Sequence, residues 1–227
     1  MHHAGIGVTV SIDYGATGSS KGSWSLGGRR GPGRTTRMLH LSDVKILAIL
    51  GGKGAGKSTA AQYLAEKLDA KAYALADPLK ETLCIELGLS QEQLHGTQAQ
   101  KDAVDPRYGL SPRQLMERQG DGLRAIFGED CLVDYTLDAI YRDMPPLAIV
   151  SDVRRTNEVE ALRCDGALLW RLHYAPAMVC GPGTHISEAE WMKPEVDLEI
   201  VPGVQGLTEL FAALDEACSF FGLSSRK

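Results

Sequence analysis

A glycine-rich stretch after the first apolar run has the residue types and spacing needed to bind a phosphate group. It reads Gly51-Gly52-Lys53-Gly54-Ala55-Gly56-Lys57-Ser58, with Thr59 next. Glycines let the backbone curl until its N–H groups point at a phosphate, and the amino end of a following helix also favours an anion. The motif G-x-x-x-x-G-K-S, between an apolar strand and a helix, therefore predicts a P-loop. We expect the whole stretch from Gly51 to Thr59 to bind ATP.

Two residues are candidate ligands for the magnesium ion that accompanies a triphosphate. The Ser58 hydroxyl follows Lys57, whose ammonium we expect at the β- and γ-phosphates. Asp152 ends an apolar run and has the form of a Walker B carboxylate. An aspartate that caps the next turn is the alternative, but Arg154 follows two residues later and favours the metal role. We predict Ser58 and Asp152 as metal ligands, and Lys57, Asp152 and Arg154 as catalytic groups.

Cationic side chains recur after predicted strands and in first helical turns, where a second phosphorylated substrate would need them. Lys80 and Arg113 both lie in the first turn of a predicted helix, where the dipole disfavours a cation. Such placement favours phosphate binding over a solvated surface role. Arg124 is explained equally well as a surface arginine, whereas the position of Arg154 favours function.

Apolar runs and helical periodicity alternate from residue 44 onward. Strands are expected at 44–50, 71–76, 146–151, 167–173 and 198–201. Helices are expected at 58–68, 77–87, 112–127, 129–143, 157–164, 185–192 and 206–221, and the stretch 90–110 holds a short helix and a loop. This alternation predicts an α/β fold, with a parallel five-stranded sheet covered by helices on both faces.

Three further motifs follow the P-loop, and their order in the chain is more specific than any one of them. They are A-D-P-L-K at 76–80, S-P-R-x-L-M at 111–116 with Q-G and an arginine downstream, and S-D-V-R with N-E at 151–158, before H-x-S-E at 185–188. This order resembles the deoxynucleoside monophosphate kinases of bacteriophages over about residues 44–215. These motifs also resemble those of the animal-type phosphomevalonate kinases, which have P-L-K and S-D-x-R-R segments. That family is the nearest related one.

The resemblance implies a nucleoside monophosphate kinase-like fold and the ATP- and Mg²⁺-dependent phosphorylation of a deoxynucleoside 5′-monophosphate to the diphosphate. The cations that it places at the phosphates or the acceptor are Lys80, Arg113, Arg124 and Arg154. Asp77 joins the predicted acceptor site, and Arg171 resembles a catalytic lid arginine before the loop 175–184. A phosphate acceptor is largely ionised near neutral pH and needs no general base. A hydroxyl acceptor would need one, and Asp77 is the only good candidate.

Other functions remain as alternatives. The first is another small-molecule P-loop kinase, with phosphomevalonate as the leading acceptor. The second is a nucleotide-binding switch, but the chain lacks the guanine motif N-K-x-D, and Asp152 begins D-V-R-R rather than D-x-x-G. The sequence leaves open the base and sugar of the acceptor and the oligomeric state, a homodimer included.

Charge and composition divide the chain at residue 38. Residues 1–37 carry nine of the 25 glycines and a net charge of +4, with no periodic apolar pattern, and they predict a disordered basic tail. Residues 38–227 form the predicted kinase domain. Because the total charge is −5, this domain carries −9, which argues against a broad nucleic-acid surface.

The remaining features predict a cytoplasmic protein without a membrane span. No apolar run approaches the ~20 residues that cross a bilayer. The five cysteines include no C-x-x-C pair, so neither a disulfide framework nor a zinc site is expected. His185 and Glu188 have i, i+3 spacing, but a capping or lid-anchoring role is favoured over metal binding.

Overall fold

The computed structural model describes residues 44–52, 54–173, 190–201 and 206–224. Several predictions fall outside these ranges: the tail 1–37, Lys53 of the P-loop, and the pair His185 and Glu188.

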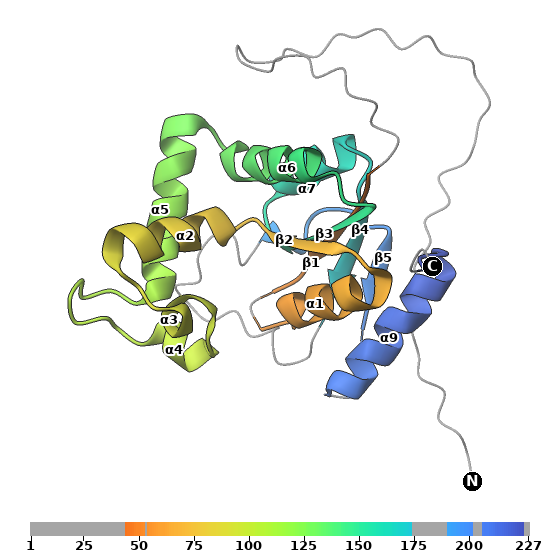
Figure 1. Ribbon diagram of the computed structural model, residues 1–227, viewed down its shortest axis with the longest axis horizontal. Helices are drawn as coiled ribbons and strands as arrows, with labels where there is room; N and C mark the ends of the chain where they lie inside the picture. The colour runs from red at the N-terminus through yellow and green to blue at the C-terminus, as the bar shows by residue number, and fades with distance from the viewer. Residues whose placement is uncertain (1–43, 53, 174–189, 202–205, 225–227) are drawn as a thin grey trace, which may run out of the picture.

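The centre of the molecule is a parallel five-stranded sheet (Figure 1). Its strands, in chain order, are β1 Lys45–Leu50, β2 Lys71–Ala74, β3 Leu147–Val153, β4 Leu168–Leu172 and β5 Leu198–Ile200. They lie in the order β2-β3-β1-β4-β5, and each neighbouring pair is parallel. Near-continuous apolar runs such as β1 and β3 are typical of strands buried on both faces. The predicted α/β fold with a five-stranded parallel sheet is therefore confirmed.

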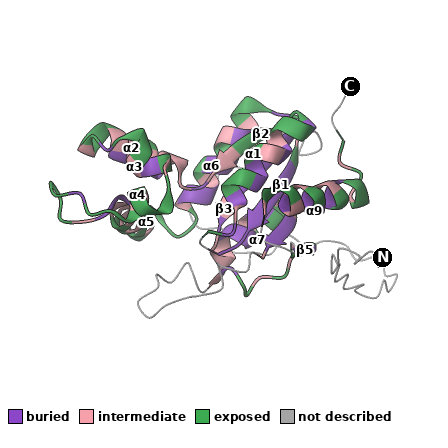
Figure 2. Cartoon of the chain, turned by 90° about the horizontal axis from the view of Figure 1, so that it is seen from below, coloured by how far each residue is buried: buried purple, intermediate pink, exposed green. Residues whose placement is uncertain are grey.

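Helices cover the two faces of the sheet and complete two hydrophobic cores. The first core packs α1 Lys57–Leu68 and α9 Leu207–Phe220 against one face. The second packs α6 Cys131–Asp143 and α7 Thr156–Cys164 against the other. Figure 2 shows buried strands between helices whose outer surfaces are exposed. Alternate residues of β1 serve the two cores, as the two-residue period of a strand requires.

A third group of helices lies beside the sheet, and we call it the helical lobe (Figure 1). It consists of α2 Asp77–Leu87, α3 Gln91–His95, α4 Gln98–Asp102 and α5 Pro112–Phe127. Its small core contains Leu83, Leu89 and Leu94. The sequence predicted only one short helix between residues 90 and 110, whereas the structure has two, each with its own capping box. The second of these short helices, α4, contributes side chains to the candidate active site described below.

Two local predictions near β3 need correction. The strand continues to Val153 instead of ending at Ser151. The helix expected from residue 157 begins at Thr156, where Glu158 accepts the backbone N–H of Arg155, at 3.1 Å. The Asn157 amide donates to the Glu129 carbonyl, at 3.0 Å. Within the described ranges, no helix combines the length and apolar character needed to cross a membrane.

Candidate active site

A cavity of about 530 Å³ lies between the sheet and the helical lobe. One wall is the loop and first turn that follow β1, and the floor includes residues that follow β2 and β3. The opposite wall comes from α2, α3, α4 and α5. Ligands of open α/β sheets collect at the carboxyl ends of the strands, and this cavity is in that position.

The cavity is strongly cationic, although the protein as a whole is acidic. The described residues that line it include seven cations and three carboxylates, a net charge of +4. The cations are Lys57, Lys80, Lys101, Arg113, Arg124, Arg154 and Arg155. The carboxylates are Glu117, Asp152 and Glu158. Such a cleft concentrates positive potential where an anionic ligand would bind.

The P-loop owes its shape to glycines at specific positions. Gly54 and Gly56 have φ angles of 76° and 82°, in the left-handed region that glycine adopts without strain. At Gly51, an added Cβ would lie 2.7 Å from the Leu172 carbonyl oxygen, so only glycine fits without a backbone shift. Gly52 packs against the Trp191 ring, which an added Cβ would approach to 3.1 Å. The close packing against β4 and Trp191 fixes the loop on the sheet.

Most of the predicted ATP-binding residues reach the cavity. Its lining includes Gly54, Ala55, Gly56, Lys57, Ser58 and Thr59. Among the described lining residues, Gly51 and Gly52 are missing, because they form the base of the loop. The buried Lys57 ammonium donates to the carbonyls of Gly51 and Gly52, at 2.7 and 2.8 Å. Lys57 is therefore held at the loop before any ligand binds.

Asp152 enters the cavity because β3 contains a bulge. Opposite β1, Ala48 pairs with Val150 and Leu50 pairs with Val153, so β3 has one extra residue in this interval. Asp152 has a φ of 64°, a left-handed conformation that costs a non-glycine residue about 1–3 kcal/mol. Bulges of this kind redirect a side chain, and they are frequent beside active sites. The sequence located Asp152 at the strand end but gave no sign of the bulge.

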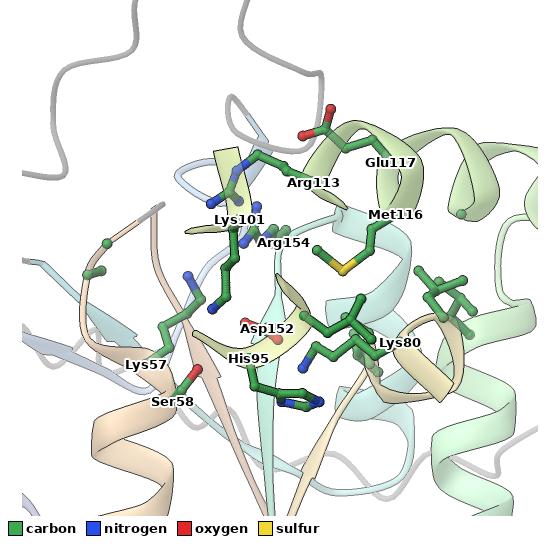
Figure 3. Close-up of a pocket in the computed structure, with 18 of the residues that line it drawn as sticks. Lys57, Ser58, Lys80, His95, Lys101, Arg113, Met116, Glu117, Asp152 and Arg154 are labelled. Atoms are coloured by element: carbon green, nitrogen blue, oxygen red, sulfur yellow. The ribbon is translucent and has the colours of Figure 1, made fainter. Parts of the chain in front are cut away.

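The charge state of Asp152 suits a metal ligand. Burial opposes its ionisation, but the neighbouring cations Lys57, Arg154, Lys80 and Lys101 outweigh burial and lower the pKa of this carboxyl. Figure 3 shows the Asp152 carboxylate between Ser58 and Lys57 on one side and Lys80 on the other. An ionised carboxylate and a hydroxyl are oxygen donors of the kind that Mg²⁺ takes from P-loop proteins, where phosphates and waters supply the rest. The described residues contain no group of three His, Cys, Asp or Glu side chains that could hold a metal unaided.

Lys80 and Asp77 have different positions, although both were predicted at the acceptor. Lys80 lines the cavity, and its ammonium pairs with the Asp77 carboxylate at 3.0 Å. Asp77 also accepts the backbone N–H of Ala74, at 3.2 Å. Asp77 is not among the described residues that line the cavity. It therefore connects the end of β2 to Lys80 and holds that lysine in place.

Arg113 lines the cavity from the first turn of α5 and also ties α5 to α4. Its Nε donates to Asp102 and its Nη2 donates to Gln98, both at 2.5 Å. Asp102 and Gln98 are the last and first residues of α4. Arg113 therefore serves the structure of the lobe as well as the charge of the cavity.

A buried carboxylate organises the arginines that follow β3. The Glu158 side chain accepts the backbone N–H groups of Arg154 and Arg155, at 3.0 and 3.1 Å. Its other oxygen accepts a hydrogen bond from Nη2 of Arg124 in α5, at 3.0 Å. Arg155 in turn pairs with Asp121 of α5, at 3.0 Å. These bonds join the lobe to the loop after β3, and they place Arg124, Arg154 and Arg155 on the cavity.

Arg171 is the predicted catalytic residue that the structure does not bring to the cavity. It is buried in β4, where it pairs with Glu199 of β5 and donates to the carbonyls of Trp191 (3.3 Å) and Pro194. It is absent from the described cavity lining. Its proposed lid, the loop 175–184, lies outside the described residues. Its catalytic role stays a prediction, and its observed partners are structural.

Sequence reasoning missed several residues of the lobe wall, among them His95, Gln98, Lys101 and Met116. His95 is held at the end of α3, and burial together with Lys80 lowers its pKa. Lys101 lies in α4, which the sequence analysis did not assign. The sequence did carry a signal for α4, because Thr97 and Gln100 have the spacing of a capping box.

Comparisons with known proteins found similar sequences. The family model for deoxynucleotide monophosphate kinase matches residues 45–110. A protein of Acanthamoeba polyphaga mimivirus, described as "Putative deoxynucleotide monophosphate kinase", is 35% identical over 168 residues, which cover 64% of this chain and 81% of that protein.

Solved structures show more distant similarity. The shikimate kinase of Bacteroides thetaiotaomicron is 11% identical, with a TM-score of 0.43 over 79% of this chain and 99% of its own. The tunicamycin resistance protein of Deinococcus radiodurans is 14% identical, with a TM-score of 0.41 over 81% of this chain and 99% of its own.

Proposed function

The chain belongs to the deoxynucleotide monophosphate kinase family, and we propose that it transfers the γ-phosphoryl group of ATP to a deoxynucleoside 5′-monophosphate. The observation that carries the proposal is the placement of cations on both walls of one cavity. Lys57 belongs to the P-loop wall, whereas Lys80 and Arg113 belong to the lobe. A reaction between two phosphorylated substrates needs both sets, because each substrate repels the other.

On the donor side, the P-loop holds the phosphates of ATP. Backbone N–H groups from Gly54 to Thr59 face the β-phosphate, and the amino end of α1 adds a favourable dipole. Lys57 exchanges its two carbonyl partners for phosphate oxygens. Because this lysine is already positioned at the loop, little rearrangement is needed when ATP binds.

Ser58 and Asp152 are the proposed protein ligands of Mg²⁺. The low pKa of the Asp152 carboxyl keeps it ionised at neutral pH, as a metal ligand must be. When bound, the ion neutralises charge on the β- and γ-phosphate oxygens.

On the acceptor side, Lys80, Arg113 and Arg154 bind the 5′-monophosphate, and Arg124 supports them from α5. All four line the cavity. The acceptor phosphate is largely ionised near neutral pH, so its oxygen attacks without a general base. Asp77, the candidate base for a hydroxyl acceptor, is absent from the described cavity lining and pairs with Lys80 instead.

A coupled ADP-release assay tests this proposal. Purified protein is given ATP and Mg²⁺ with each of the four deoxynucleoside monophosphates, the four ribonucleoside monophosphates and phosphomevalonate. We expect turnover with at least one deoxynucleoside monophosphate and none with phosphomevalonate. Turnover with phosphomevalonate alone would contradict the proposed acceptor.

A further inference from the structure

Lys101 has the features of a substrate ligand, although no motif pointed to it. It lies in α4 of the lobe and lines the cavity. Figure 3 shows its side chain extending into the cavity from the lobe wall, toward the part that contains Lys57 and Asp152. Its charge interacts with Lys80 and Arg113 of the acceptor wall, and also with Asp152. Lys101 thus lies between the groups proposed for the acceptor and those proposed for the donor.

The environment of this ammonium is unfavourable without an anion. Burial lowers the pKa of Lys101, and the charges of Lys80 and Arg113 lower it further. The described part of the chain provides no hydrogen bond or ion pair to its Nζ atom. A half-buried cation beside other cations is costly unless a ligand neutralises it. The cavity therefore places an unsatisfied positive charge where two substrates would meet.

The position of Lys101 is built by its surroundings. Thr97 and Gln100 form a reciprocal capping box, with bonds of 2.8 and 3.3 Å, that starts α4. Arg113 binds both ends of this helix, through Gln98 and Asp102. Such bonds fix α4 on α5 and hold the Lys101 backbone in the lobe wall. A flexible surface lysine would have no comparable support.

We propose that Lys101 is a further catalytic residue that contacts the phosphoryl group during its transfer. This inference rests on the proposed function. In that reaction an acceptor phosphate oxygen bonds to the γ-phosphorus of ATP. The bond from that phosphorus to the β,γ-bridging oxygen breaks, and this oxygen leaves with its electron pair as part of ADP. Lys101 donates hydrogen bonds to the transferring group and keeps its proton. Its charge stabilises oxygens that belong fully to neither substrate in the transition state.

Steady-state kinetics of three variants test the proposal. Lys101→Met removes the charge and keeps much of the side-chain length, Lys101→Arg keeps the charge, and Lys71→Met is the control. Lys71 is an exposed lysine at the start of β2 that pairs with Asp143. We expect kcat of Lys101→Met to fall by about 100-fold or more, the scale of losing one transition-state donor. ATP affinity should change by less than about 3-fold, and Lys101→Arg should recover part of kcat.

A bisubstrate analogue gives a readout that does not depend on turnover. The probe is a dinucleoside pentaphosphate that joins adenosine to the deoxynucleoside preferred by the wild-type protein. Lys101→Met should weaken binding of this probe at least about 10-fold more than binding of ATP or of the monophosphate alone, because only the probe fills the transfer position. The melting temperature should not fall, because no bond of the Lys101 ammonium is lost.

The outcomes separate this inference from the proposed function. If the wild-type protein phosphorylates no deoxynucleoside monophosphate, the proposed function fails and this inference fails with it. If the wild type is active but Lys101→Met keeps its kcat, the inference alone is overturned. An increase confined to the acceptor KM would also overturn it, because Lys101 would then be an ordinary acceptor ligand like Lys80.

Discussion

The two walls of the cavity are held in place by different kinds of interaction. On the P-loop wall, Lys57 bonds to carbonyls five and six residues away, and the glycine backbone packs against β4. On the lobe wall, ion pairs join distant segments, such as Arg124 and Glu158, which are 34 residues apart. The donor wall is therefore a single loop seated on the sheet, whereas the acceptor wall depends on how separate helices assemble. Variants should reflect this difference.

The largest effect is expected from Lys57→Ala in the donor wall. The change removes a point charge from the transferring phosphoryl group, so kcat/KM should fall by at least about 100-fold, the scale of losing one electrostatic contact in the transition state. Circular dichroism should show that the fold persists. Lys71→Met serves again as the matched lysine control, and near-wild-type turnover by Lys57→Ala would remove the basis for the P-loop assignment.

Two glycine variants compare the walls directly. In Gly51→Ala the new Cβ would lie 2.7 Å from a backbone carbonyl, so the loop must shift and ATP affinity should fall about 10-fold or more, in line with the 1–3 kcal/mol of overpacking. In Gly120→Ala the new Cβ meets only side-chain ends, 3.1 Å from Arg124 and 3.4 Å from Leu79, which can yield. Titration with ATP should therefore separate the two variants, and equal affinities would show that the P-loop wall is less rigid than we infer.

Glu158→Gln tests how the lobe is joined to the sheet. The substitution keeps the shape of the side chain but removes the negative charge of the carboxylate. That carboxylate accepts hydrogen bonds from Arg124 and from two backbone N–H groups. We expect a loss of about 1–3 kcal/mol in the free energy of unfolding, the scale of a hydrogen bond to a charged group, with a lower kcat for the acceptor. Urea unfolding measures the first effect. The exposed Glu160 provides the control variant Glu160→Gln, which should match the wild type in both measurements.

The smallest effect concerns the pH dependence of the lobe. Hydrogen bonds from Arg107 and Gln93 lower the pKa of Asp105 below its ordinary value of 3.8. A carboxyl with a lowered pKa adds stability above its ordinary pKa, and this stability is lost as the pH falls further. Asp105→Asn should therefore melt below the wild type at pH 7, and the difference should shrink as the pH falls below 3.8. A difference in melting temperature that stays constant down to pH 2 would contradict this account.

The same contrast explains what the sequence could predict. The P-loop fold and the five strands depend on local patterns, and both were confirmed. Asp152 lies in β3 and lines the cavity, but its role as a Walker B ligand stays a prediction. The role of Asp77 depends on where the Lys80 side chain goes, which no pattern encodes. The partner of Arg171 depends on sheet register, because the pairing of β4 with β5 places Arg171 directly opposite Glu199. The bulge at Asp152 also depends on pairing with β1. Lys101 was missed because the helix that presents it has only five residues.

The central claim is that one cavity binds a donor on the P-loop wall and an acceptor monophosphate on the lobe wall. The most direct test compares ATP affinity and acceptor kinetics for Arg113→Ala, with Asp102→Asn as a control that loosens the tie to α4 but keeps the guanidinium. We predict that the acceptor KM of Arg113→Ala rises about 10- to 100-fold, as expected for a lost charged hydrogen bond, while the Kd of ATP changes less than about 3-fold. Asp102→Asn should show a smaller increase. An unchanged acceptor KM, or an equal loss of ATP affinity, would contradict the claim.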